Sequence, residues 1–91
     1  MSAVYTHSVV VSDPVGLHAR PIGQIVSLAK DKGVQIQLSR PGGDAVAAVS
    51  ALKLLAMKVK TGEEITVVVE ADDDDTARQV AHAIEAFINQ G

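Results

Sequence analysis

The apolar residues of this chain repeat at two different spacings, and the order in which those spacings occur most constrains its fold. Alternating apolar and polar residues predict strands, whereas apolar residues three and four positions apart predict helices. Turn formers such as Pro14, Gly16 and the run of residues 41–43 separate the segments. The predicted order is strand, helix, strand, strand, helix, strand, helix, with strands at residues 4–11, 34–38, 44–47 and 65–69.

Three segments carry helical signals. The first helix is expected over residues 19–31, before a stop at Gly33, and a short second helix between Ser50 and Met57. The third follows the acidic run of residues 72–75, which favours a helix N-terminus and lacks the spaced ligands of a calcium loop. The apolar stripe of the first helix is Ile22, Ile25, Val26 and Ala29, and that of the third is Ala77, Val80, Ala81, Ile84 and Ile88.

This element order predicts an α+β fold in which helices cover one face of a mainly antiparallel sheet. The 91 residues, 47% of them hydrophobic, suffice for one domain, residues 1–91, and are too few for two. Only Tyr5 and Phe87 are aromatic, so Val, Ile, Leu and Ala must build the core. Such a small domain has few side chains to wall a deep pocket, so we expect any reactive chemistry at the surface.

Charge and composition exclude several classes of function. The net charge of -3 and the lack of a basic run interleaved with aromatics argue against nucleic acid as a partner. With no cysteine, the chain has neither disulfides nor thiolate catalysis nor cysteine zinc sites. No stretch approaches the roughly 18 apolar residues of a membrane span, and residues 1–11 lack the pattern of a signal peptide. We therefore expect a cytoplasmic protein that does not insert into a membrane.

The segment from Gly16 to Pro21 holds the residues best suited to chemistry. Pro21 belongs in the first turn of a helix, where its missing N–H costs nothing, so His18 should be the N-cap or lie next to it. The amides that follow, at Ala19 and Arg20, and the positive end of the helix dipole form a site for phosphate. The Arg20 guanidinium can hold two phosphate oxygens. Because neutral imidazole is a nucleophile near neutral pH, His18 is a candidate phosphoryl acceptor.

Plainer interpretations of the histidines stay open at this point. A histidine two residues before an arginine is a weak pattern, and His18 can equally be a loop residue beside a solvated Arg20. His7 falls in a strand and His82 in the last helix, and no suitably spaced Cys or acid completes a metal site with His18. We expect no metal and no cofactor. An independent histidine phosphatase would need an acid and a pocket beside His18, and Asp13, the nearby carboxylate in sequence, lies in a Pro/Gly loop.

Ser50 also has two interpretations. A serine that opens a helix is first of all an N-cap that accepts a hydrogen bond from the next turn. Alternatively, a serine kinase phosphorylates Ser50, where the dianion would sit at a helix N-terminus and repel acidic partners. The chain would then be a regulatory binding module, with Ala51, Leu52 and Leu55 as its docking patch.

The run Gly16-Leu17-His18-Ala19-Arg20-Pro21 closely resembles the active-site motif of the HPr family, the histidine-containing phosphocarriers of the bacterial sugar phosphotransferase system. The resemblance covers nearly the whole chain. It continues through the second helix and into the fourth strand at Ser50, Leu55, Met57, Val59 and Gly62-Glu63-Glu64-Ile65-Thr66. It implies an open-faced β-sandwich, with a four-stranded antiparallel sheet in the order 1-4-2-3 covered on one face by three helices.

The resemblance also implies a function. Enzyme I would phosphorylate His18 on Nδ1 with phosphoenolpyruvate as the source, and His18 would pass the group to IIA domains of sugar permeases, with Arg20 binding the phosphate. The chain would be a monomeric carrier modified by partner enzymes, not an enzyme itself. Nitrogen-linked signalling and phosphoryl supply to a dihydroxyacetone kinase stay open as alternatives to sugar uptake.

Two places depart from the family pattern. Ile22 stands where alanine is usual after the motif, and Val49-Ser50-Ala51-Leu52 replaces the Lys-Ser-Ile-Met form common where the serine is regulated by a kinase. Ala51 offers less apolar contact area than isoleucine, which argues against regulation at Ser50. Leu52 and Leu55 are positioned to compensate for that loss.

Overall fold

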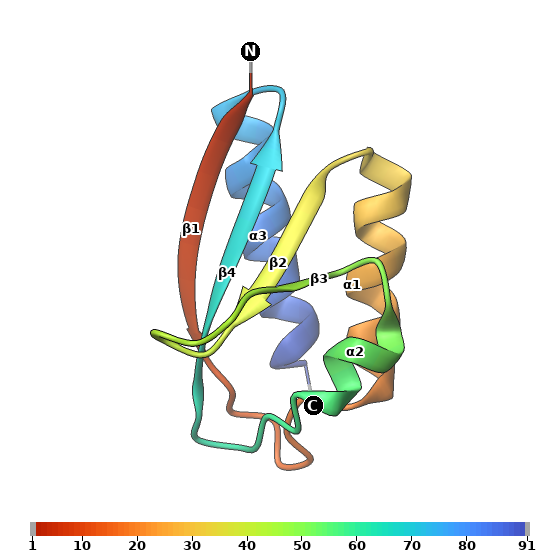
Figure 1. The fold of residues 1–91 in the computed structure, drawn as a ribbon, viewed down its shortest axis with the longest axis vertical. Coiled ribbons are helices and arrows are strands. Elements are labelled where there is room, and N and C mark those ends of the chain that lie inside the picture. The colour runs from red at the N-terminus through yellow and green to blue at the C-terminus, as the bar shows by residue number, and fades with distance from the viewer. Residues whose placement is uncertain (1, 91) are drawn as a thin grey trace.

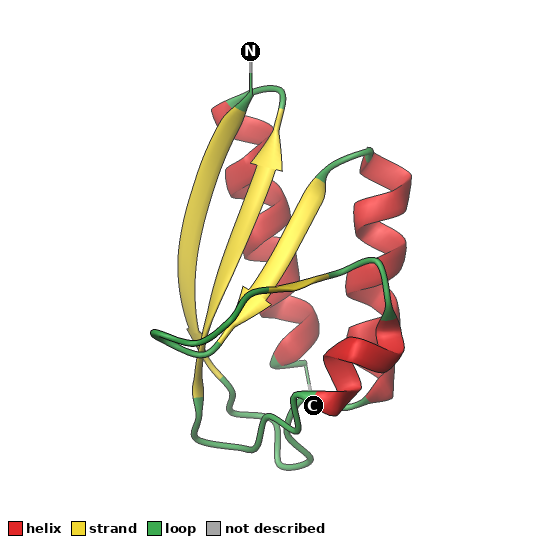
Figure 2. Ribbon diagram, viewed as in Figure 1, coloured by secondary structure: helices red, strands yellow, loops and turns green. Residues whose placement is uncertain are grey.

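The computed structural model describes residues 2–90, which form one sheet with three helices on one of its faces (Figure 1). Figure 2 shows the helices on one side and the strands on the other. The elements, in the order predicted from the sequence, are β1 (Ala3–Val10), α1 (Ala19–Lys32), β2 (Gln35–Ser39), β3 (Val46–Ala47), α2 (Ala51–Ala56), β4 (Glu64–Ala71) and α3 (Asp74–Ile88).

The four strands are antiparallel and lie in the order β1-β4-β2-β3, as predicted. β4 is central and pairs with β1 from Ala3 opposite Ala71 to Val10 opposite Glu64. On its other edge β4 pairs with β2, and β2 forms a hairpin with β3. No helix within residues 2–90 is long and apolar enough to cross a membrane.

Alternate residues of the central strands point into a layer of aliphatic side chains under the helices. Ile65, Val67 and Val69 of β4 are buried, while the residues between them are half-buried on the open face. α1 and α3 bury the stripes predicted from their spacing, and Val26 of the first stripe is half-buried. The aliphatic residues of the two helices with 0% exposure are Ile22, Ile25, Ala77, Ala81, Ile84 and Ile88.

The lengths of two strands differ from those expected. β3 has only two residues, Val46–Ala47, because the turn at residues 41–43 leads into an exposed segment before pairing with β2 begins. β4 is longer than expected, Glu64–Ala71, because β1 offers hydrogen-bonding partners along its whole length. Hydrophobic alternation marks only the part of a strand that is buried on one face, so it underestimates a central strand.

The acidic run begins α3, as the sequence predicted. Asp73 is the N-cap, and its carboxylate accepts hydrogen bonds from the Thr76 hydroxyl at 2.7 Å and the Thr76 N–H at 3.2 Å. These bonds lower the pKa of Asp73 below its usual value, the hydroxyl bond contributing most. Asp74 and Asp75 lie exposed in the first turn, where negative charge is favourable.

Candidate functional site

The turn that precedes α1 is held by a glycine in a conformation open to few other residues. Gly16 has φ of 82°, and a Cβ at this position would lie 2.8 Å from the carbonyl oxygen of Val59. The next residue, Leu17, donates its N–H to that same carbonyl at 3.0 Å. The turn therefore lies directly on the loop before β4, and this contact determines where the following residue, His18, begins the helix.

His18 is the N-cap of α1, in agreement with the prediction from Pro21. Its backbone is extended, and its carbonyl accepts the first helical hydrogen bond, from Ile22 N–H at 3.2 Å. Its side chain makes no capping hydrogen bond and is 32% exposed. In the described part of the chain, the N–H groups of Ala19 and Arg20 have no acceptor, and Pro21 has no N–H. Two free donors thus follow the imidazole at the positive end of a helix dipole.

Asp13 is the buried partner of His18. Its Oδ2 lies 3.6 Å from His18 Nε2, and the Asp13 side chain is only 4% exposed. Its Oδ1 accepts a hydrogen bond from Val15 N–H at 2.8 Å. Its carbonyl accepts bonds from the Gly16 N–H at 2.9 Å and the Thr61 hydroxyl at 2.5 Å. Among residues 2–90, Asp13 is the only charged residue in the buried class.

This carboxylate gives the two nitrogens of the imidazole different environments. A negative oxygen facing Nε2 favours the tautomer that carries its proton on that nitrogen. That tautomer has its lone pair on Nδ1. The sequence alone assigned no role to Asp13. An aspartate two residues before the N–H it accepts is an Asx turn, and that signal was present in Asp13-Pro14-Val15.

An arginine just after β2 forms hydrogen bonds with the loop of residues 57–63, which lies beside the site. Arg40, which follows β2, donates from Nε to Glu63 Oε1 at 2.8 Å and from Nη2 to the carbonyl of Met57 at 2.8 Å. Glu63 also accepts the Lys60 N–H at 2.6 Å. The Arg40 hydrogen bond, followed by that of Lys60, lowers the pKa of Glu63 below its usual value. These hydrogen bonds hold in place the segment in which Val59 and Thr61 contact the turn before His18.

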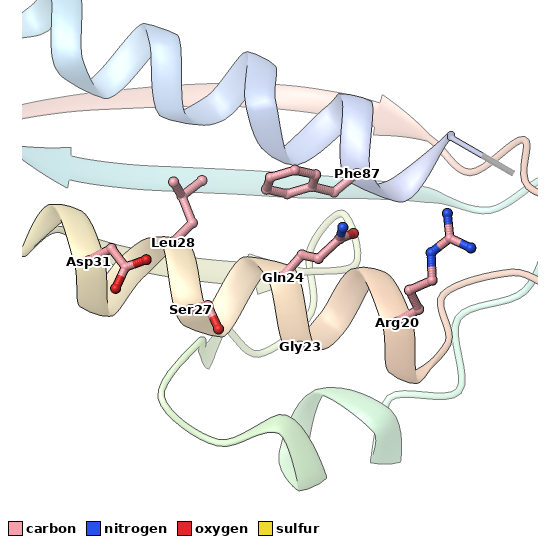
Figure 3. Close-up of a pocket in the computed structure, with 7 residues that line it drawn as sticks. All are labelled: Arg20, Gly23, Gln24, Ser27, Leu28, Asp31 and Phe87. Carbon is pink, nitrogen blue, oxygen red and sulfur yellow. The ribbon is translucent and has the colours of Figure 1, made fainter.

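Arg20 is exposed and free for a ligand. No ion pair found in residues 2–90 includes its guanidinium. Its side chain lines one end of an open groove between α1 and α3, together with Gln24, Leu28 and Phe87 (Figure 3). A cation with several donors and no ion-pair partner in the described residues, two positions after His18, suits an anion that sits at the start of α1.

Ser50 and the three docking candidates lie around α2. Ser50 is the N-cap of this helix, and its hydroxyl accepts the Lys53 N–H at 3.3 Å, so the capping interpretation is confirmed. Ala51 is exposed, Leu52 is 78% exposed and Leu55 is 38% exposed. α2 lies beside the first turns of α1, so this apolar face is on the same end of the molecule as His18 (Figure 1).

Two further exposed apolar residues were not selected from the sequence. Val15, in the turn before His18, is 71% exposed, and Val49, just before α2, is 82% exposed. Neither belongs to a helical or alternating pattern, which is why periodicity does not reveal them. Val15 thus adds an exposed apolar side chain to the loop before His18, as is typical of a surface that partners cover. Val49 lies elsewhere, beside Ala29, Lys30 and Val34 toward the far end of α1.

Comparison with known proteins agrees with this geometry. Residues 5–90 match the family model described as the PTS HPr component phosphorylation site. The chain is 33% identical over 76 residues to phosphocarrier protein HPr of Mycoplasma pneumoniae, covering 84% of this chain and 86% of that protein. It is 35% identical over 72 residues to HPr of Lysinibacillus sphaericus, covering 79% and 81% of the two chains.

A solved structure has the same fold. The HPr of Bacillus anthracis superposes with a TM-score of 0.76 at 27% identity, over 93% of this chain and 96% of that one. A four-stranded sheet under three helices, with a histidine at the amino end of the first helix, defines a small phosphocarrier. The chain belongs to the HPr family, the phosphocarriers of the phosphotransferase system.

Proposed function

We propose that His18 Nδ1 accepts a phosphoryl group from phosphorylated enzyme I and passes it to IIA domains of sugar permeases. The observation that carries this proposal is the position of His18 as the N-cap of α1, with its own side chain outside the helix and the Ala19 and Arg20 amides free. An anion on the ring would meet both amides and the helix dipole. The unpaired Arg20 guanidinium supplies the balancing charge.

The transfer step needs positioning more than proton chemistry. The Nδ1 lone pair forms a bond to phosphorus while the bond between phosphorus and the donor atom of enzyme I breaks, and that electron pair stays with the donor. The proton on Nε2 does not move. The ring becomes cationic once Nδ1 is phosphorylated, and the Asp13 carboxylate, 3.6 Å from Nε2, stabilises this charge. Donation to a IIA domain reverses the same bond changes.

We also propose that the chain does not catalyse the transfer by itself. It is a cytoplasmic monomer without cofactor that partner enzymes modify, and the partners supply the second half of each transfer site. The exposed face of Ala51, Leu52 and Leu55 next to α1 provides the docking surface for them. Membrane lipid and nucleic acid are not among its partners, since the net charge of -3 gives no attraction to their phosphates.

Labelling with phosphoenolpyruvate and enzyme I tests the proposal directly. Wild-type protein should gain one acid-labile phosphoryl group, and His18→Ala should gain none while keeping its fold by circular dichroism. An acid-labile adduct that persists in His18→Ala would overturn the assignment.

Arg20→Ala should slow the transfer by roughly ten-fold to a hundred-fold, since one charge-assisted contact to the phosphoryl oxygens is lost. Lys32→Ala, which removes a cation from the far end of α1, is the matched control and should transfer at the wild-type rate. The branch served is then identified by measuring phosphoryl transfer from the labelled protein to separate IIA domains from sugar, nitrogen-linked and dihydroxyacetone-kinase systems.

A regulatory role through Ser50 is the second candidate, because the exposed face of α2 begins at this residue. An ATP-dependent serine kinase and its phosphatase would be the partners. Phosphate on Ser50 would be acid-stable, which separates it from phosphate on His18. Incubation with such a kinase, followed by acid treatment and mass spectrometry of Ser50→Ala against wild type, decides whether this site is used.

A further inference from the structure

Three side chains with metal-binding atoms face one another between β1 and α3. His7 points from β1 toward the helices, and His82 and Glu85 lie three residues apart on α3. His7 Nε2 is 2.8 Å from Glu85 Oε1, and the ring centroids of His7 and His82 are 4.8 Å apart. One ligand atom from each of the three residues can be chosen so that all lie within 4.8 Å of one another.

The sequence gives no indication of this cluster, because His7 and Glu85 are 78 positions apart in the chain. The expectation of no metal considered His7 and His82 only in combination with His18. The pairing of β1 with β4 and the packing of α3 on β1 bring the three residues together instead. They take no part in the site around His18.

We propose that His7, His82 and Glu85 bind a divalent transition metal ion, with Zn²⁺ as the representative member of the class. Two imidazole nitrogens and one carboxylate oxygen are a donor set preferred by Zn²⁺, Co²⁺ and Ni²⁺ and not by Mg²⁺ or Ca²⁺. Three protein ligands leave a further coordination position for water. The ion takes the position of the proton shared between His7 and Glu85.

The geometry needs only side-chain adjustment to hold such an ion. Zinc bonds of about 2.0–2.2 Å place tetrahedral ligand atoms roughly 3.3 Å apart, so the pair at 2.8 Å opens slightly and the wider pairs close. His82 is exposed and the Glu85 side chain is 41% exposed, so both can rotate without disturbing the core. The Tyr5 ring, with centroids 6.1 Å and 6.2 Å from those of His7 and His82, lies beside both imidazoles.

The bound ion would join the first strand to the last helix. Unfolded chain does not hold His7 near the two ligands of α3, so the ion binds the folded state and raises its stability. At zinc concentrations a hundred times the dissociation constant, we expect the Tm to rise by about 10 °C or more.

Calorimetric titration of the full chain with Zn²⁺ tests the site. Wild type should bind one ion. His82→Gln, which changes an exposed residue and leaves the His7–Glu85 pair intact, should bind at least ten-fold more weakly and lose the rise in Tm. His18→Gln is the matched control, because it removes a histidine that has its own carboxylate partner outside this site, and its zinc binding should equal that of wild type.

Imidazole nitrogen resonances identify the ligands independently of stability. Zinc should shift the signals of His7 and His82 and leave those of His18 unchanged. The proposal is overturned by the absence of binding at millimolar zinc, by unchanged binding in His82→Gln, or by loss of binding in His18→Gln. None of these readouts depends on phosphoryl transfer, so a failure of the metal site would leave the proposed function untouched, and the reverse.

Discussion

At the scale of single residues, one buried carboxylate, that of Asp13, organises the region around the His18 imidazole. Asp13 accepts a hydrogen bond from Val15 with its Oδ1 and hydrogen bonds from Gly16 and Thr61 with its carbonyl. Its Oδ2 faces His18. A charge that is 4% exposed costs free energy unless it is paired or hydrogen-bonded. In the described residues, His18 is the only side chain that pairs with the Asp13 carboxylate. The imidazole therefore offsets part of the cost of burying this charge, and the carboxylate in turn orients the imidazole.

Asp13→Asn should separate the electrostatic role of this residue from its role in the turn. The amide oxygen can still accept from Val15, which turns the NH₂ group toward His18 Nε2 and favours the tautomer protonated on Nδ1. The nucleophilic lone pair is then on the wrong nitrogen, and we expect phosphorylation by enzyme I to slow by roughly ten-fold to a hundred-fold. Imidazole ¹⁵N shifts report the tautomer directly.

Thr61→Val is the matched control for that change. It removes the hydroxyl bond to the Asp13 carbonyl and leaves the carboxylate in place. Its phosphorylation rate should be much closer to wild type than that of Asp13→Asn. Equal rates in wild type and Asp13→Asn, with His18 still protonated on Nε2, would contradict the role given to the carboxylate.

At the scale of elements, the loop between α2 and β4 is stabilised by charge. Arg40 and Glu63 hold residues 57–63 against the end of β2. The turn before His18 forms a hydrogen bond with that loop. The pKa of Glu63 is lowered in the folded protein. The pair therefore stabilises the fold above the unfolded pKa of about 4.3, and this contribution is lost as the pH falls through the folded pKa.

Glu63→Gln should remove this pH-dependent contribution. At pH 7 the variant should unfold at a lower urea concentration than wild type, and the gap should narrow as the pH falls below about 4.3 and Glu63 becomes protonated. Urea midpoints measured from pH 7 to pH 3 check the expectation. A gap that stays constant over that range would show that the charge on Glu63 is not what stabilises the loop.

The elements themselves were largely predictable, and the contacts between loops were not. The α1 and α3 stripes, the Ser50 cap and the acidic start of α3 followed from local spacing, and the strand order followed from the family resemblance. The His18–Asp13 pair depends on a turn whose path is determined by Gly16 against Val59, 43 positions later in the chain. Pattern analysis along the chain does not detect such a contact.

At the scale of the whole molecule, stability rests on one thin layer of aliphatic side chains. Ile84 of α3 is fully buried in that layer. Protein interiors are close-packed, so truncating such a side chain leaves a cavity. Ile84→Ala should lower the free energy of unfolding by about 2–5 kcal/mol, out of a total of roughly 5–15 kcal/mol for a domain.

That variant should still be phosphorylated at temperatures where it stays folded, because Ile84 takes no part in the hydrogen bonds and the ion pair described around His18. Chemical denaturation measures the loss, and labelling with enzyme I at 10 °C measures the retained function. Complete loss of labelling in a folded Ile84→Ala sample would mean that packing under α3 governs the site.

The contact of the Gly16 turn with Val59 has a consequence for how such a protein can diversify. Backbone atoms at Gly16, Leu17 and Val59 determine the position of His18, whereas the side chains of Leu52 and Leu55 take no part in that contact. Substitutions on the exposed side of α2 can therefore alter the choice of partner without displacing the imidazole. In the function we propose, recognition and chemistry thus lie on separate elements, so a duplicated copy can acquire new partners while its reaction stays the same.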